Sequence, residues 1–209
     1  HPVSVKGIQD RFYVLFDDNV VDPLLSSAYG AGQQYHWVED INVVNVTDSP
    51  DGSDYDTVNN TVQALLAAAD VHGWYINMDV TKQEKVLSES VTIQGKIIFT
   101  TYLRDNSVGN SCEPNLGQGR LYVIDAFTGL PVADLYTGEG VKDLSQVKKE
   151  HRFKQLARTG IPSDPLIIFR KTQTGDVTPT VVVTTELPLP ENILGKNLHT
   201  KTWWIDLEN

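Results

Sequence analysis

Four aspartates close to Gly52 are the residues of this sequence best suited to metal chemistry: Asp48, Asp51, Asp54 and Asp56. Calcium takes about six to eight oxygen ligands, and one flexible acidic loop can supply several of them. The spacing of these aspartates does not match the D-x-[DN]-x-[DN]-G loop that binds calcium in known proteins. The stretch therefore has two interpretations, a calcium site and a solvated acidic loop, and calorimetry with calcium separates them.

The motifs that mark common catalytic sites are missing. The sequence contains no G-x-S-x-G, no H-E-x-x-H, no G-x-x-x-x-G-K-[ST] and no G-x-G-x-x-G. Its five histidines are scattered, and we expect them to be structural or surface residues. Cys112 is the only cysteine, which excludes an internal disulfide and a zinc site built on several cysteines.

A strand followed by an Asp-x-x-Thr-Gly turn is the most informative local pattern. It occupies residues 119–129 and ends with Asp125, Thr128 and Gly129. We expect the side chains of Asp125 and Thr128 to cap the turn backbone while Gly129 takes a positive φ. We interpret the turn as a single copy, and a single copy does not demonstrate a repeat.

Charge and hydropathy narrow the range of partners. The 209 residues include 17 Lys and Arg against 27 Asp and Glu, for a net charge of −10. A surface this acidic repels phosphate backbones, so we expect no nucleic-acid partner. No apolar run reaches the roughly 18 residues that a membrane helix needs, so we expect no membrane span.

The elements that must position these residues are mostly strands. Short β-branched and aromatic stretches recur between turn-forming residues. We predict strands at 11–16, 41–46, 73–78, 85–87, 91–93, 96–102, 119–125, 130–135, 166–169, 180–185 and 201–205. Helical spacing occurs at 58–69 and, more weakly, at 144–156. The sequence therefore predicts an all-β fold, a sandwich or part of a propeller, with one or two short inserted helices.

Several further segments share the order and spacing of one known family. They are Ile8–Leu15, Gly73–Ile76, Glu84–Leu87, Gly95–Tyr102, Ser111–Pro114, Gly160–Pro165 and Thr202–Asp206. Residues 119–129 are similar to the blade-closing turn of quinoprotein-type β-propellers. Together these segments resemble the C-terminal propeller region of the PilC/PilY family, the type IV pilus tip-associated adhesins and biogenesis factors. The resemblance covers nearly the whole chain.

The resemblance implies a partial quinoprotein-like β-propeller. Ten or so strands make about two to three blades, whereas a closed propeller needs about four to eight. We therefore expect residues 1–209 to be the C-terminal portion of a propeller domain, a fragment of a longer chain. Unpaired strand edges would then require other polypeptide to close the sheets.

The family also implies a function by surface contact, without catalysis. It suggests a secreted protein at the pilus tip or outer-membrane surface of a Gram-negative bacterium, which supports pilus biogenesis, attachment and cell adhesion. Its implied partners are minor pilins or other tip proteins, the rest of the propeller chain, and a host or surface receptor. The calcium loop of the family has no match in this segment, so no calcium ligand is carried over. A second cysteine that family members often carry near Cys112 is absent too.

Two other functions are compatible with the same patterns. One is a quinone-cofactor (PQQ-type) dehydrogenase propeller, suggested by the turn at Asp125 and disfavoured by its single copy. The other is an outer-membrane assembly scaffold on a similar propeller. Cofactor absorbance separates the dehydrogenase from the rest, and co-purification with minor pilins separates the adhesin from the scaffold.

Overall fold

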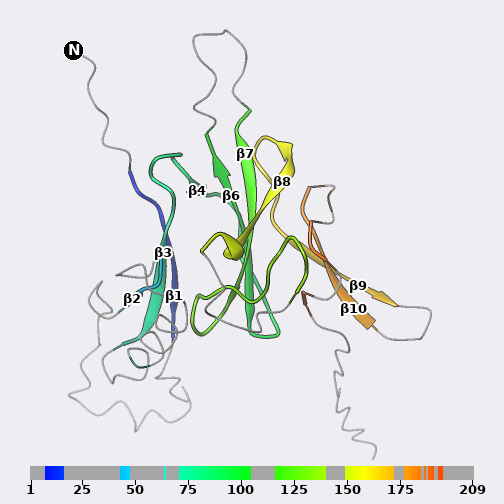
Figure 1. Ribbon diagram of the computed structural model, residues 1–209, viewed down its shortest axis with the longest axis horizontal. Helices are drawn as coiled ribbons and strands as arrows, with labels where there is room; N and C mark the ends of the chain where they lie inside the picture. Colours follow the sequence, from blue (N-terminus) through cyan, green and yellow to red (C-terminus); the bar gives the residue numbers. More distant parts are fainter. Residues whose placement is uncertain are drawn as a thin grey trace, which may run out of the picture.

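The computed structural model describes ten β-strands and one 3-10 helix, arranged as three sheets (Figure 1). The residues that it describes are 8–16, 43–47, 64, 71–104, 116–139, 149–171, 177–184, 186, 188–190 and 193–194. Nearly all the regular structure in this part of the chain is strand. The fold is all-β, as the sequence predicts.

Successive stretches of the chain build the three sheets. The first sheet has the order β1-β3-β2, with β1 at Arg11–Leu15, β2 at Val44–Asn45 and β3 at Gly73–Asn77. The central sheet has the order β4-β6-β7-β8, with β5 paired to β6. Its strands are β4 Lys85–Val86, β5 Val91–Ile93, β6 Lys96–Leu103, β7 Gln118–Asp125 and β8 Phe153–Thr159. The third sheet pairs β9, Leu166–Lys171, with β10, Val177–Val182.

The central sheet lies between the other two and is buried on both faces (Figure 1). Adjacent residues of a strand point to opposite faces, so Ile97 and Phe99 of β6 pack against Trp74 and other residues of the first sheet. Ile98 packs on the opposite face, in a cluster that includes Val181 of β10. Burial on both faces explains why β6 and β7 read as nearly continuous apolar runs.

A two-residue turn joins β5 to β6. Gln94 has a φ of 50° and Gly95 a φ of 70°, the pair of left-handed conformations that a tight hairpin favours. The backbone oxygen of Gly95 also accepts a 2.8 Å hydrogen bond from the amide of Ala126. This hairpin therefore lies beside the Asp-x-x-Thr-Gly turn that follows β7.

Most predicted strands within the described residues are confirmed, but 130–135 is not a strand. Pro131 makes one isolated bridge to Ile124. Proline has no amide hydrogen to continue a ladder. Leu130 is instead buried in the cluster between the first and central sheets, and Ala133 and Leu135 are buried in the cluster between the central and third sheets. Their burial produces an apolar pattern similar to that of a strand.

The predicted helix at 144–156 is wrong where the structure describes it. Residues Lys149–Arg152 form only a 3-10 turn, η4, and β8 begins at Phe153. Phe153 pairs with Tyr122 of β7. Leu156 is buried in the second core, the cluster of Ile98 and Val181 between the central and third sheets. Ladder hydrogen bonds and burial outweigh the weak helical spacing. The predicted helix at 58–69, apart from residue 64, and the strand at 201–205 lie outside the described residues.

Candidate functional site

Glu84 is a buried carboxylate, 2% exposed, at the centre of a polar network. Four donors surround its two oxygens. Oε2 accepts from Arg120 Nη1 at 3.0 Å and from the backbone amide of Asp79 at 3.0 Å. Oε1 accepts from Thr101 Oγ1 at 2.6 Å and from Tyr122 Oη at 3.0 Å. The charge of Glu84 is therefore balanced by Arg120, and its oxygens are occupied.

The central sheet positions this network. Glu84 immediately precedes β4, Thr101 is on β6, and Arg120 and Tyr122 are on β7. Arg120 and Tyr122 are two residues apart on one strand, so both point to the same face. The Arg120 guanidinium also stacks over the ring of Phe153 on β8, 4.1 Å from its centroid. The carboxylate thus joins the segment before β4 to β6 and β7, and Arg120 connects the network to β8.

Tyr122 is a buried phenol beside a negative charge. Its ring stacks on Phe99, with centroids 4.8 Å apart. Burial, and then the nearby negative charge of Glu84, raise the pKa of Tyr122 far above its ordinary value. The hydroxyl therefore remains a hydrogen-bond donor to Glu84 throughout the physiological range.

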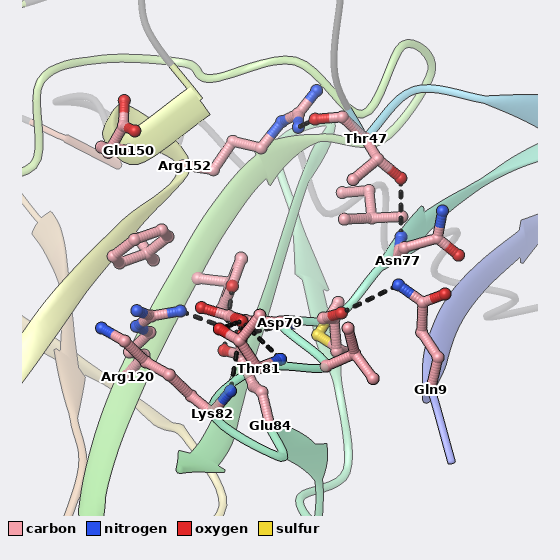
Figure 2. A pocket seen from close by; sticks show the side chains of 15 residues that line it. Gln9, Thr47, Asn77, Asp79, Thr81, Lys82, Glu84, Arg120, Glu150 and Arg152 are labelled. Atoms are coloured by element: carbon pink, nitrogen blue, oxygen red, sulfur yellow. Dashed lines mark hydrogen bonds and ion pairs between the residues drawn. The ribbon is translucent and has the colours of Figure 1, made fainter. Parts of the chain in front are cut away.

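A cavity of about 580 Å³ opens beside the network, between the first and central sheets (Figure 2). Most of its lining residues are polar or charged. They are Gln9, Thr47, Ile76, Asn77, Met78, Asp79, Val80, Thr81, Lys82, Glu84, Arg120, Tyr122, Glu150, Arg152 and Phe153. Clefts of this volume accommodate small organic molecules.

Asp79 shapes the turn that presents Lys82 to this cavity. Its Oδ1 accepts from the Thr81 amide at 3.0 Å, from Thr81 Oγ1 at 2.6 Å and from the Lys82 amide at 3.2 Å. Although burial acts in the opposite direction, these hydrogen bonds hold the pKa of Asp79 below its usual value. The carboxylate stays ionised and keeps the turn closed.

Arg152 lines the same cavity and is 2% exposed. Its guanidinium donates to three backbone carbonyls: Gly129 at 3.0 Å, Thr47 at 2.6 Å, and Val46. The residue stands at the end of η4, immediately before β8. It therefore links the residues that follow β2 to the turn after β7 and to the start of β8.

The Asp-x-x-Thr-Gly turn has the hydrogen bonds that its pattern predicts. Asp125 Oδ1 accepts from the amides of Phe127 and Thr128, at 3.0 and 2.9 Å, and from Thr128 Oγ1 at 2.9 Å. The Gly129 amide donates a 2.9 Å hydrogen bond to the backbone oxygen of Asp125, and Gly129 has a φ of 66°. The turn is structural and adds no side chain to the cavity lining.

The interpretation of this turn as a single copy is wrong. Asp134-Leu-Tyr-Thr-Gly138 is a second copy. Asp134 Oδ1 accepts a hydrogen bond from the Tyr136 amide at 2.8 Å. The Gly138 amide donates to the backbone oxygen of Asp134, also at 2.8 Å. Gly138 has a φ of 79°. The prediction of a strand over 130–135 concealed this repeat, because it placed Asp134 within the strand.

The predicted calcium ligands Asp48, Asp51, Asp54 and Asp56 lie outside the described residues, as does Cys112. Within the ranges that the structure describes, no group of three or more His, Cys, Asp or Glu side chains could hold a metal ion. Sequence reasoning missed the roles of Glu84, Arg120 and Arg152. The one available signal was a charged residue inside an apolar run, as at Arg120 in β7.

Comparisons of the chain with protein-family models, with curated proteins and with solved structures found no match. Among the described residues, the structure contains no helix with the length and apolar character required to cross a membrane.

Proposed function

We propose that the chain is part of a β-propeller in a pilus-tip protein of the PilC/PilY type, which acts as a non-enzymatic adhesin or assembly factor. The observation that carries the proposal is the face-to-face stacking of three sheets built from successive stretches of the chain (Figure 1). In a propeller, consecutive antiparallel blades pack face to face. The central and third sheets are antiparallel, as is the pair β1–β3, whereas β2 pairs with β3 in parallel. The resemblance of the segments that include β1, β3, β6 and β7 supplies the family.

Two features support a propeller in particular. The two Asp-x-x-Thr-Gly turns, at Asp125 and Asp134, are of the type that closes blades in quinoprotein-like propellers. Apolar side chains are also exposed on the two outer sheets, where further blades would pack. They include Leu15 of β1 at 58%, and Leu166 and Ile168 of β9 at 59% and 42%.

The polar network fits a structural role better than a catalytic one. Glu84 is neutralised by Arg120 and its oxygens accept four hydrogen bonds, so it has little capacity to act as a base. Such a network joins strands of one sheet. In the proposed function the surface of the protein makes the contacts, with minor pilins, the rest of the propeller and a host or surface receptor. The proposed calcium ligands are Asp48, Asp51, Asp54 and Asp56.

Immunogold electron microscopy of sheared surface filaments tests the proposal. An antibody raised against this chain should label filament tips in the organism that encodes it, and deletion of the gene should reduce the number of surface filaments. A control strain complemented with the gene should regain both. Antigen confined to the periplasm, with filaments unlabelled and unchanged in number, would contradict the pilus-tip function.

The second copy of the turn strengthens one alternative function, a quinone-cofactor dehydrogenase. Repeated Asp-x-x-Thr-Gly turns also resemble those of quinone-cofactor dehydrogenases, so the argument from a single copy no longer applies. The two functions differ in a direct observable. Protein purified from its natural source should show no quinone absorbance if it is the adhesin, and bound quinone with dye-linked dehydrogenase activity if it is the enzyme.

A further inference from the structure

We infer that the cavity between the first and central sheets binds a small hydroxylated organic anion, a carboxylate or a phosphate monoester. This inference does not depend on the proposed function. It rests on three observations: unused cationic donors at one end of the cavity, neutral polar groups at the other, and a volume of about 580 Å³.

The cationic end is formed by Arg120 and Lys82. The Arg120 guanidinium has five N–H donors, of which Nη1 gives one hydrogen bond to Glu84. Its side chain is 11% exposed and is held in place by the stack on Phe153. A rigid guanidinium with unused donors is suited to a planar or tetrahedral oxyanion.

Lys82 adds a second positive charge to the lining of the cavity. The Lys82 and Arg120 side chains both line the cavity, and Figure 2 shows them extending to the same side of it. In the described part of the chain the Lys82 ammonium has no ion pair and no hydrogen-bond partner. An anion there would be bound by a flexible point charge and a fixed fork together.

The carboxylates near this end accept hydrogen bonds from the protein itself. Glu84 accepts four hydrogen bonds, and Asp79 Oδ1 accepts three within its own turn. Glu150 lies near Arg152, away from Lys82 (Figure 2). Both carboxylates stay charged, so Glu84 and Asp79 balance Arg120 and Lys82 at this end of the cavity. The groups that remain for a ligand there are donors: the Lys82 ammonium and the Arg120 N–H groups that do not bind Glu84.

The opposite end of the cavity offers neutral polar groups. Gln9 uses its Nε2 to bond the Met78 carbonyl at 3.3 Å, and Asn77 uses its Oδ1 to accept from Arg11 at 3.1 Å. Each amide keeps one polar atom that these bonds do not use. Hydroxyl groups of a ligand match such atoms, which is why we infer a hydroxylated anion.

Isothermal titration calorimetry of the full chain tests this with D-glucuronate, D-glucose 6-phosphate and D-glucose. We expect one or both anions to bind and the neutral sugar not to bind; the anion that binds identifies the group as carboxylate or phosphate. Lys82→Gln should weaken binding about tenfold, the loss of one charge-assisted contact. Lys171→Gln, which removes an exposed lysine of β9 outside the cavity, should leave it unchanged.

Arg120→Lys provides a second variant that keeps the charge and removes the fork. It should weaken the anions while its circular dichroism spectrum stays that of the parent chain. The inference would be overturned if neither anion binds at millimolar concentration, if D-glucose binds equally well, or if Lys82→Gln and Lys171→Gln have the same affinity as the parent chain.

Discussion

Arg152 donates a hydrogen bond from Nε to the backbone oxygen of Gly129 at 3.0 Å, across 23 positions of the chain. The same guanidinium binds the carbonyls of Val46 and Thr47. One buried cation therefore joins the first sheet to the turn that follows β7. Charged donors are among the strongest partners for buried carbonyls, so this contact has consequences for stability.

Arg152→Met should lower the free energy of unfolding by about 3 kcal/mol, because three carbonyls lose a charged donor in a buried place. Urea denaturation followed by circular dichroism measures the change. Arg158→Met is the matched control, since Arg158 is exposed on β8. It should alter the free energy by no more than about 0.5 kcal/mol. Equal effects of the two substitutions would contradict the role of Arg152.

Gly129→Ala should destabilise the chain more than Gly95→Ala. Both glycines have a left-handed φ, 66° and 70°, so both substitutions cost about 1 kcal/mol of backbone strain. A Cβ at Gly129 would also lie 2.7 Å from Val46 Cγ2 and 2.9 Å from Trp74 Cε3, whereas at Gly95 its nearest contact is 3.7 Å.

The crowding at Gly129 should add about 1–3 kcal/mol to its cost. Thermal denaturation of the two variants side by side measures the difference. If Gly95→Ala lowered the melting temperature as much as Gly129→Ala, the close approach of Trp74 to this turn would be refuted.

Glu84→Gln should destabilise the chain by about 3–5 kcal/mol, because it leaves Arg120 as a buried charge without its counter-ion. Chemical denaturation gives the free energy of unfolding. Glu89→Gln removes an exposed carboxylate from the neighbouring loop and serves as the control. The role assigned to Glu84 fails if the two glutamine variants are equally stable.

Tyr122 should make the folded chain sensitive to alkali. Burial and the charge of Glu84 raise its pKa in the folded state, whereas in the unfolded chain it ionises near 10.0. Above that pH the unfolded state releases a proton that the folded state retains. Stability from this group is therefore complete below pH 10 and falls by about 1.4 kcal/mol per pH unit above it.

Tyr122→Phe removes this ionisation. The free energy of unfolding of the variant, measured between pH 9 and 11, should fall less steeply than that of the parent chain. The variant also loses the hydrogen bond to Glu84, so it should be less stable at pH 7. Parallel slopes for the two proteins would show that Tyr122 ionises in the folded state.

The strands and tight turns were predictable from sequence because their signals are local. β-branched and aromatic runs predicted β1, β3, β6 and β7, and the Asp125 pattern predicted a capped turn with a left-handed glycine. Side-chain caps and glycine conformations act over a few residues, so they do not depend on the rest of the fold.

Packing decided the elements that the sequence misassigned. Residues 153–156 have a weak helical spacing, yet β8 forms there because the edge of β7 offers a ladder and the second core offers burial for Leu156. Residues 130–135 have an apolar pattern like that of a strand, but Pro131 cannot extend a ladder. Both outcomes depend on neighbours distant in the chain.

The all-β class and the turn chemistry were thus determined by the sequence itself, because period-two patterns and capped turns are written in adjacent residues. The polar network and the cavity were decided only by the tertiary structure. Glu84 meets Tyr122 across 38 positions, and Arg152 meets Thr47 across 105. No local pattern specifies such contacts. Pairing of β4, β6 and β7 in the central sheet brings Glu84 to Tyr122, and stacking of the first sheet on the central sheet brings Thr47 to Arg152. Burial in this structure excludes water from the charges.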